Sequence, residues 1–227
     1  MEPCRRDTFP AIALASSYLH DVMGVSGDEP VVICPVDPYV EDGYFKTIEE
    51  LGRQAAKGES NLVLMGIKPT YPSEKYGYII PTDESRISKV SSFKEKPDGK
   101  MAQEYIAQGV LWNGGVFACR LNYMLDKAHE LIDFEDYADL FEKYGELNKI
   151  SFDYAVVENE ENIQVMRYEG QWKDLGTWNT LTEAMGENSV GNAIIGNTCQ
   201  NVHVINELNV PILAIGLSDM VISVGVY

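Results

Sequence analysis

The sequence predicts an α/β fold, with a mostly parallel sheet flanked by helices and a short β appendage at its C-terminal end. Two apolar runs, Val31–Cys34 and Asn61–Ile67, have the uninterrupted pattern of strands buried on both faces. Residues 44–57, between them, have the pattern of an amphipathic helix. A strand–helix–strand unit of this kind favours parallel strands joined by a right-handed crossover.

Further elements are expected along the chain. Residues 8–23 are predicted to form a helix, with Thr8 as its N-cap and Pro10 in its first turn. Beyond Gly186, short β-rich segments alternate with Asn and Gly turns. We therefore divide the chain into a core, residues 1–187, and a β region, residues 188–227. Additional strands are expected at 76–80, 90–94, 110–120 and 162–168, and additional helices at 100–109, 121–147 and 177–185.

Composition narrows the classes of function. The chain of 227 residues has 35 acidic and 18 basic residues, a formal net charge of -17. A surface this negative repels nucleic acids but still permits a small phosphorylated ligand, more easily with a divalent cation present. No run approaches the ~20 apolar residues of a membrane span, and the four cysteines are scattered. We therefore expect a cytoplasmic protein with no membrane partner.

Two aspartates are candidate ligands for a hard cation. Asp37 follows the first predicted strand and lies between Pro35 and Pro38, at a strand end where α/β sheets bind ligands. It could equally be an ordinary turn residue. Asp174 lies between two tryptophans in a turn that we expect to be packed, where a carboxylate needs a partner. Its alternative role is the N-cap of the following helix, which Thr177 could also serve.

Four further residues have the chemistry of a sugar-phosphate site. Glu95 could accept hydrogen bonds from hydroxyls and Lys96 could meet a phosphate, although FKEKPD could also be a solvated hairpin. Asn113 and the glycines after it interrupt an apolar strand, which suggests either a bulge or close approach of a ligand. Gly77, between two tyrosines, could let a sugar approach the backbone, or belong to an aromatic edge strand.

Six strings of the sequence are informative together: EPCRRDTFPAIALA, GIKPTYPSEKYGYI, FKEKPD, LWNGGVF, ISFDYAV and WKDLGTW. In their order and spacing they resemble the bacterial mannose-1-phosphate guanylyltransferases, within the sugar-nucleotidyltransferase superfamily. The similarity extends from Glu2 to about Val226. No P-loop, Rossmann fingerprint or G-x-S-x-G elbow is present.

The resemblance implies a reaction and a set of roles. Mannose 1-phosphate and GTP would give GDP-mannose and pyrophosphate, with Mg²⁺ as cofactor. The site residues follow by their match to the family's motifs. The metal ligands would be Asp37 and Asp174, the sugar contacts Gly77, Glu95 and Asn113, the phosphate contact Lys96, and the nucleotide-binding segment Arg6, Asp7 and Thr8.

The chemistry of this reaction suits such a site. A phosphomonoester has its second pKa near ~6 and is largely dianionic at neutral pH. It therefore needs no general base to attack the α-phosphorus of GTP. Catalysis then consists of positioning and charge neutralisation, which two carboxylates with Mg²⁺ and one lysine can supply.

The sequence also departs from the family's pattern. The family usually has P-S-D-H around the first aspartate, whereas this chain has Pro35-Val36-Asp37-Pro38. The family's glycine-rich G-x-G-x-R loop and first strand would precede Met1. We therefore expect weak catalysis by this chain alone, and self-association through an unpaired sheet edge. Two alternatives stay open: a non-catalytic relative that binds sugar phosphates or nucleotide sugars, and the same chemistry on another sugar 1-phosphate.

Overall fold

The computed structural model describes residues 2–106 and 108–226. It divides into two compact units. The first contains the chain up to Pro35 together with Glu41–Gly170, and the second contains Val36–Val40 together with the chain from Gln171 onward. The boundary predicted between residues 187 and 188 falls inside the second unit. Within the described residues, no helix has both the length and the apolar character that spanning a membrane requires.

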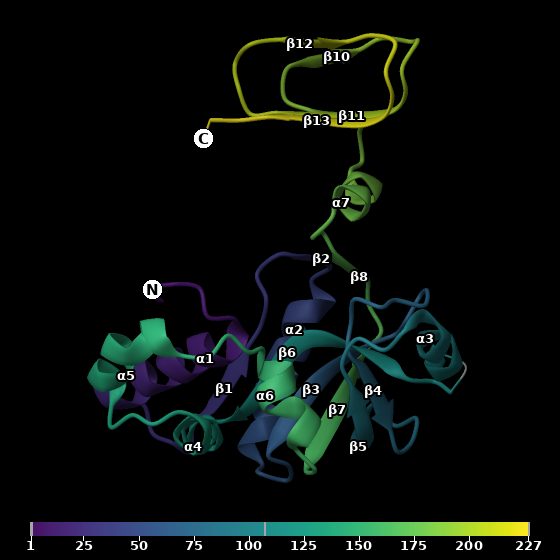
Figure 1. Ribbon diagram of the computed structural model, residues 1–227. Coiled ribbons are helices and arrows are strands. Elements are labelled where there is room, and N and C mark those ends of the chain that lie inside the picture. The colour runs from purple at the N-terminus through teal and green to yellow at the C-terminus, as the bar shows by residue number, and fades with distance from the viewer. Residues whose placement is uncertain (1, 107, 227) are drawn as a thin grey trace. The chain divides into compact units, whose positions relative to one another are not determined.

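A sheet forms the middle of the first unit (Figure 1). Its strands are β1 Pro30–Ile33, β3 Leu62–Ile67, β4 Tyr78–Pro81, β5 Ile87–Lys94, β6 Leu111–Arg120 and β7 Ile163–Tyr168. They lie in the order β1-β6-β3-β7-β5-β4, with an additional pairing of β6 with β4. These strands confirm the expected α/β core with a central sheet.

The sheet is mostly antiparallel, so the expectation of a mostly parallel sheet is wrong. Among its described strand pairs, only β3 and β7 run parallel. β1 and β3 do point the same way, since both pair antiparallel with β6. The strand–helix–strand pattern therefore predicts the direction of its two strands correctly. A strand from far along the chain lies between them, and local periodicity cannot reveal such a long-range insertion.

Burial differs between the two strands that the apolar runs predicted. Every residue of β3 is buried, as expected for a strand covered on both faces. The residues of β1 are only half-buried, and β6 is the only described strand that pairs with it. The expectation of full burial is therefore wrong for β1, which has one strand neighbour in this sheet where β3 has two.

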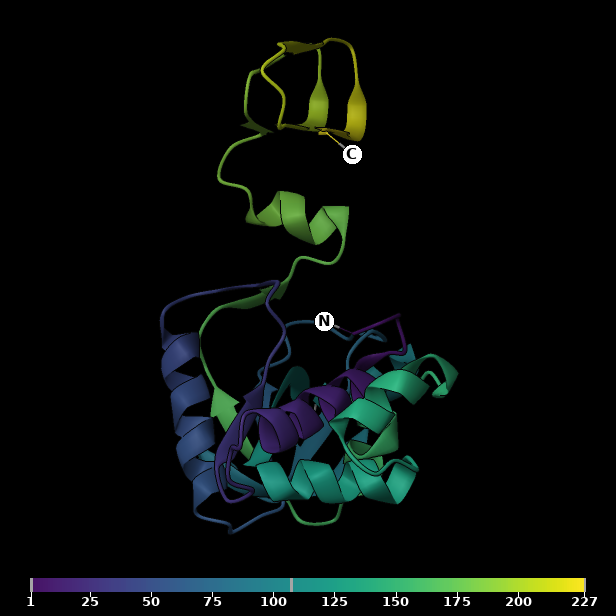
Figure 2. The same cartoon turned by 90° about the vertical axis from the view of Figure 1, so that its left-hand side faces the viewer.

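Helices cover both faces of the sheet. Their bounds are α1 Thr8–Ser17, α2 Gly43–Ala56, α3 Gly99–Ile106, α4 Leu121–Leu131, α5 Tyr137–Lys143 and α6 Phe152–Ala155. α2 lies on one face, and α1, α4 and α5 lie on the opposite side (Figure 2). The main apolar core includes Phe9 of α1, Leu64 of β3, Phe117 of β6 and Phe152 of α6. The packing of α6 into this core positions the candidate site described below.

The helix expected at 8–23 is present but changes character. α1 ends at Ser17 and continues as a π-helical turn, Tyr18–Val22. Asp7, and not Thr8, is its N-cap: the Asp7 carboxylate accepts a hydrogen bond of 2.8 Å from the Thr8 backbone N–H. The Thr8 hydroxyl oxygen accepts instead from the backbone N–H of Phe152, at 2.8 Å. Thr8 therefore joins the start of α1 to the start of α6.

The double glycine in β6 forms an irregularity in the sheet, as its position inside an apolar strand suggested. Leu64 pairs with Phe117 and Gly66 pairs with Asn113, so β6 has two more residues than β3 across this interval. Gly115 has φ +70, a left-handed backbone conformation that favours glycine. The bulge lies directly after Asn113.

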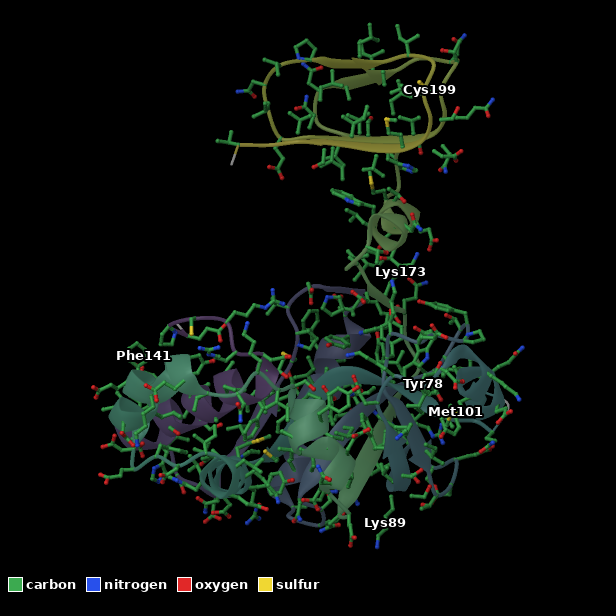
Figure 3. The ribbon with its side chains drawn as sticks, viewed as in Figure 1. Tyr78, Lys89, Met101, Phe141, Lys173 and Cys199 are labelled. Carbon is green, nitrogen blue, oxygen red and sulfur yellow. The ribbon has the colours of Figure 1, made fainter. Side chains whose placement is uncertain are left out.

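The second unit contains a strand pair, a helix and a coil of parallel strands. β2 Pro38–Val40 pairs antiparallel with β8 Trp172–Asp174, and α7 spans Trp178–Ala184. β11 Gln200–Asn206 pairs parallel with both β9 Ser189–Val190 and β13 Ser218–Val224, and β10 Ala193–Ile195 pairs parallel with β12 Ile212–Ala214. Cys199 packs against the small apolar core of this coil (Figure 3).

Candidate active site

Glu95 and Lys96 follow β5 and form an ion pair. The Lys96 Nζ lies 3.0 Å from Glu95 Oε1, and the side-chain exposures are 49% for Lys96 and 5% for Glu95. Neighbouring residues of a regular strand point to opposite sides, but Lys96 has φ 44, and this bend coincides with the end of the strand. The hydrogen bond from the ammonium group to Glu95 raises the pKa of Lys96 above its usual value. Lys96 therefore remains a cation at neutral pH.

The second carboxylate oxygen of Glu95 is buried and has no hydrogen-bond partner among the described residues. It faces Gly77: a Cβ at that glycine would lie 2.6 Å from Glu95 Oε2 and 2.7 Å from Phe93 Cζ. A side chain at this position would require the ends of the Glu95 and Phe93 side chains to shift. A buried acceptor without a partner is costly, and hydroxyl donors of a ligand would satisfy it.

Asn113 lies beside this pair and is itself nearly buried, with 9% exposure. Its backbone N–H donates to the carbonyl oxygen of Gly77 at 2.8 Å. Its side-chain Nδ2 donates to Asp153 Oδ1 at 2.6 Å, and its Oδ1 accepts from the Gly115 N–H at 3.1 Å. The three residues assigned as sugar contacts, Gly77, Glu95 and Asn113, are thus brought together with Lys96 in one cluster.

Asp153 is a member of this cluster that was not predicted from the sequence. It lies in the first turn of α6, which Ser151 caps. Burial, and next the negative charge of Glu95, raise the pKa of Asp153 to about 6, against the opposing effects of its own backbone N–H, Asn113 and Lys96. The string ISFDYAV contains this residue, but nothing in a short helical string shows which strand it will face.

The tyrosines that flank Gly77 have different environments. Tyr78 is completely buried, and its hydroxyl accepts from the Ser73 N–H and donates to the Ser73 carbonyl. Tyr78 is therefore a structural residue and not a wall for a sugar. Tyr76 packs on Trp112, with ring centroids 4.8 Å apart. Tyr78 thus belongs to the packed aromatic strand that was the alternative for this segment, while Gly77 faces the cluster.

Asp37 and Asp174 both belong to the second unit. Pro38 is the register partner of Asp174 in the β2–β8 pair, so the two aspartates lie at the same end of a two-stranded ladder. Asp174 Oδ1 accepts from the Gly176 N–H at 2.8 Å. The N-cap of α7 is Thr177, in a reciprocal arrangement with Thr180, so the alternative role of Asp174 as N-cap is wrong. Lys173 pairs with Glu183, at 2.8 Å.

Two carboxylates at one end of a strand pair suit Mg²⁺, which proteins bind through one or two carboxylates together with waters and substrate phosphates. Among residues 2–106 and 108–226, no group of three or more metal-ligating side chains is present. The chemistry of two carboxylates would suit a cation that also binds substrate phosphates. The assignment of Asp37 and Asp174 as metal ligands stays a prediction.

Arg6, Asp7 and Thr8 lie at the start of α1 and differ in their contacts. Asp7 caps that helix with φ 70, and Thr8 accepts from Phe152. The Nε atom of Arg6 is buried with no hydrogen-bond partner among the described residues. Their assignment to nucleotide binding stays a prediction.

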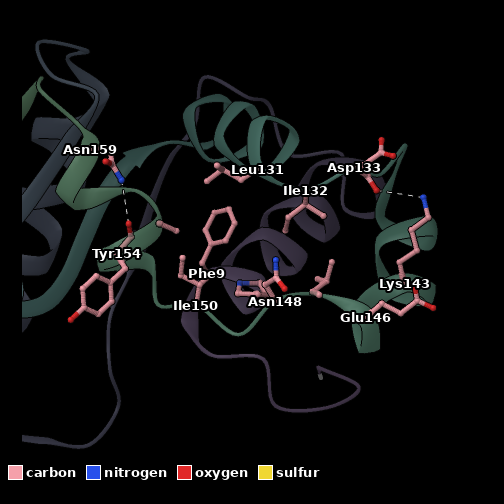
Figure 4. A pocket seen from close by; sticks show the side chains of 13 residues that line it. Phe9, Leu131, Ile132, Asp133, Lys143, Glu146, Asn148, Ile150, Tyr154 and Asn159 are labelled. Carbon is pink, nitrogen blue, oxygen red and sulfur yellow. Dashed lines mark hydrogen bonds between the residues drawn. The ribbon is translucent and has the colours of Figure 1, made fainter.

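A separate hollow of about 590 Å³ lies between α1 and the segment that leads to α6 (Figure 4). Phe9, Ile150, Leu131 and Ile132 line it, and Tyr154 lies at one side. None of the sequence-predicted site residues belongs to this lining. The hollow is mainly apolar, with charged and amide side chains in part of its lining.

Comparison with known protein families gives the class of this protein. The chain belongs to the nucleotidyl transferase family, which its residues 1–189 match. This confirms the family that the sequence strings indicated.

The chain is similar in sequence to several curated proteins. Over 98% of its length, the chain is 30% identical to the alginate biosynthesis protein AlgA of Pseudomonas aeruginosa, of which it covers 50%. It is 27% identical to a mannose-1-phosphate guanylyltransferase of Salmonella montevideo, covering 98% of this chain and 52% of that protein. The chain thus spans about half the length of the curated relatives it matches.

A solved structure shows the same fold. The crystal structure of mannose-1-phosphate geranyltransferase from Thermus thermophilus matches with a TM-score of 0.76 at 29% sequence identity. The match covers 99% of this chain and 70% of that chain.

Proposed function

We propose that this chain binds mannose 1-phosphate for the transfer of GMP from GTP, which forms GDP-mannose and releases pyrophosphate. The observation that supports this most is the buried, unpartnered Glu95 Oε2 next to Gly77, with the cationic Lys96 on the other oxygen. Glu95 offers an acceptor for sugar hydroxyls, and Lys96, the next residue, offers a cation for a phosphate. Membership of the nucleotidyl transferase family supplies the reaction class.

The reaction requires one bond to form and one to break. A phosphate oxygen of mannose 1-phosphate attacks the α-phosphorus of GTP, and the bond from that phosphorus to the bridging oxygen of the β-phosphate breaks. The electron pair leaves with pyrophosphate, so no enzyme nucleophile is needed. Because the phosphomonoester is already mostly dianionic near pH 7, the residues need only position it and balance its charge.

The residues of the cluster have distinct roles in this proposal. Lys96 meets the phosphate of the sugar, and Glu95 holds Lys96 in place and accepts from a sugar hydroxyl. Asn113 provides a hydroxyl contact, and Gly77 lets the Glu95 carboxylate pack closely against the backbone. Asp37 and Asp174 would hold Mg²⁺, which when bound neutralises charge on the phosphates of GTP.

Calorimetric titration with mannose 1-phosphate tests the proposal. We expect saturable binding that Lys96→Ala weakens about tenfold, because the Lys96 side chain is half-exposed and a solvent-screened charge contact contributes about 1 kcal/mol. Lys94→Ala is the matched control, since Lys94 is exposed on β5 two residues away, and it should bind like the unmodified chain.

The competing ligands decide between the alternatives. Mannose without phosphate should bind weakly, and glucose 1-phosphate measures sugar preference. Tighter binding of another sugar 1-phosphate would replace mannose in the proposal. Equal affinity of the Lys96→Ala and Lys94→Ala variants would contradict the assigned role of the cluster.

Transfer is measured separately, as release of pyrophosphate from GTP and mannose 1-phosphate in the presence of Mg²⁺. Binding of GDP-mannose without any release of pyrophosphate would favour the alternative of a non-catalytic binding protein.

A further inference from the structure

The side chain of Asn113 is held from two sides inside the protein. Its Nδ2 donates to Asp153 Oδ1 at 2.6 Å, and its Oδ1 accepts from the backbone N–H of Gly115 at 3.1 Å. Gly115 is the bulge residue with φ +70. The hydrogen bond from its backbone N–H to Asn113 therefore depends on a conformation that favours glycine. The other holding contact comes from a different element, α6.

These two contacts permit one orientation of the amide. An ionised carboxylate only accepts hydrogen bonds, so the NH₂ group of Asn113 must face Asp153. The carbonyl oxygen then faces the Gly115 N–H. In this orientation the second Nδ2 hydrogen and one lone pair of Oδ1 stay available to a ligand. The opposite orientation would set the NH₂ group against another donor, at the cost of an unsatisfied polar group.

The charge of Asp153 depends on its neighbours. Glu95 and Lys96, beyond the end of β5, act on it electrostatically in opposite senses. Glu158, in the 3₁₀ turn Val157–Asn159, binds the backbone N–H of Glu95 at 3.2 Å and adds negative charge nearby. The helix α1, which packs on α6, has no charged residue between Thr8 and Ser17. Burial, and next the negative charge of Glu95, bring the pKa of Asp153 to about 6.

We propose that Asp153 is a positioning residue: its ionised carboxylate, together with the Gly115 N–H, fixes the side-chain amide of Asn113 in the one orientation that presents a donor and an acceptor to the ligand. Asp153 acts through Asn113 and does not need to touch the ligand. The identity of the ligand rests on the proposed function, whereas the orientation of the amide does not.

Protonation would weaken this control. A protonated carboxyl can donate as well as accept, so only the Gly115 N–H would then favour this orientation of the Asn113 amide. Affinity for the ligand should then fall below about pH 6. Asp153→Asn keeps an acceptor of the same shape but can also rotate, so it should resemble the protonated protein at every pH.

Nuclear magnetic resonance of the ligand-free chain tests the orientation directly. We expect the side-chain NH₂ signals of Asn113 and the backbone N–H signal of Gly115 to shift together, with a midpoint near pH 6. The Asp153→Asn variant should lose this titration, while Asp126→Asn, an exposed aspartate on α4, should keep it. Signals that do not titrate, or that titrate unchanged in Asp153→Asn, would overturn the inference.

Calorimetry with mannose 1-phosphate between pH 5 and 8 then tests the consequence. The phosphate of the ligand also ionises in this range, but its ionisation affects both proteins equally. We therefore compare the ratio of the dissociation constants of the Asp153→Asn variant and the unmodified chain. This ratio should rise to about tenfold above pH 7, the effect of one lost hydrogen bond, and approach one at pH 5. A ratio that does not vary with pH would contradict the role of the carboxylate charge.

A double-mutant cycle separates positioning from direct contact. If Asp153 acts through Asn113, Asp153→Ala should weaken binding in the unmodified chain but add little to Asn113→Ala. Independent, additive losses would overturn the inference. If the Asn113 signals titrate as expected but mannose 1-phosphate fails to bind at any pH, the proposed function is wrong and the orientation of Asn113 by Asp153 is still supported.

Discussion

The two groups of candidate site residues differ in how their geometry is determined. In the first unit, the cluster of Glu95, Lys96, Asn113 and Asp153 is held by hydrogen bonds between side chains and backbone of several elements. In the second unit, Asp37 is exposed and Asp174 accepts a hydrogen bond from its near neighbour Gly176. The cluster is therefore preorganised by packing, whereas the aspartate pair depends on a short ladder and on whatever cation it binds.

The cluster and the aspartate pair should contribute differently to the free energy of unfolding. Buried, hydrogen-bonded charges lower the stability of the fold and have shifted pKa values, so they can be detected without a ligand. Asp37 is exposed and Asp174 is half-buried, and carboxylates in contact with solvent should affect stability little until a cation binds. Variants in the two units should therefore respond to different measurements.

The largest expected effect is on stability, from Asp153. Its pKa of about 6 in the folded chain lies above the ordinary value of 3.8, so the folded state binds this proton more tightly than the unfolded state. The resulting stability is present below pH 4 and is lost as pH rises through 6. At pH 8, Asp153→Asn should raise the free energy of unfolding by up to about 3 kcal/mol.

Urea unfolding at pH 4.5 and pH 8 measures this difference. Asp126→Asn is the control and should leave the pH dependence unchanged. The free energy of unfolding of the unmodified chain should fall between pH 4.5 and pH 8. An equal fall in the Asp153→Asn variant would contradict the role assigned to the Asp153 carboxylate.

Gly77→Ala should give the next largest effect. Its Cβ would lie 2.6 Å from Glu95 Oε2 and 2.7 Å from Phe93 Cζ, and overpacking of this kind costs about 1–3 kcal/mol. Chemical unfolding and binding of mannose 1-phosphate should both report the loss. Gly43→Ala is the matched control, because no atom lies within 4 Å of its added Cβ. Similar stability of the two alanine variants would show that the cluster is not tightly packed.

Asp37→Asn and Asp174→Asn probe the second unit. Each should lower the affinity for Mg²⁺ in the presence of GTP about tenfold, through loss of one carboxylate ligand, and leave the free energy of unfolding without Mg²⁺ nearly unchanged. Mg²⁺ titration followed by calorimetry measures the first quantity. Glu187→Gln, an exposed acid in the same unit, is the control. Equal Mg²⁺ affinity of all three variants would contradict a metal site at these aspartates.

The smallest effects are expected at two helix caps, one in each unit. Ser151 caps α6 by accepting from the Tyr154 N–H, and Thr177 caps α7 by accepting from Thr180. Alanine at either position should cost about 1 kcal/mol of unfolding free energy. Only Ser151→Ala should also change the titration of the Asn113 amide, because α6 contains Asp153. A change in the titration of the Asn113 amide with Thr177→Ala would contradict the assignment of this titration to the first unit.

Part of the fold could be predicted from the sequence, where the determinants are local. The apolar pattern of β3, the amphipathic face of α2 and the glycine pair of the bulge each act within a few residues. The N-cap of α1 is harder to predict, because Asp7 and Thr8 are both good capping residues. The contact of Thr8 with Phe152, distant in sequence, leaves the cap to Asp7.

The remaining features depend on long-range contacts. The position of β6 between β1 and β3 makes the sheet antiparallel where the local pattern favours a parallel one. In the candidate site, the sequence strings indicate Glu95, Lys96 and Asn113 as neighbours of a ligand. Asp153 was missed because its importance comes from burial against Glu95 and Asn113, which no pattern around it reveals.

We propose that a sugar phosphate binds at the Glu95 cluster of the first unit. Backbone chemical-shift mapping of the chain during titration with mannose 1-phosphate tests this most directly. We predict saturable shifts concentrated at Gly77, Lys96, Asn113 and Gly115. Shifts concentrated around Phe9 in the apolar hollow, or no saturable shifts at the cluster, would contradict it.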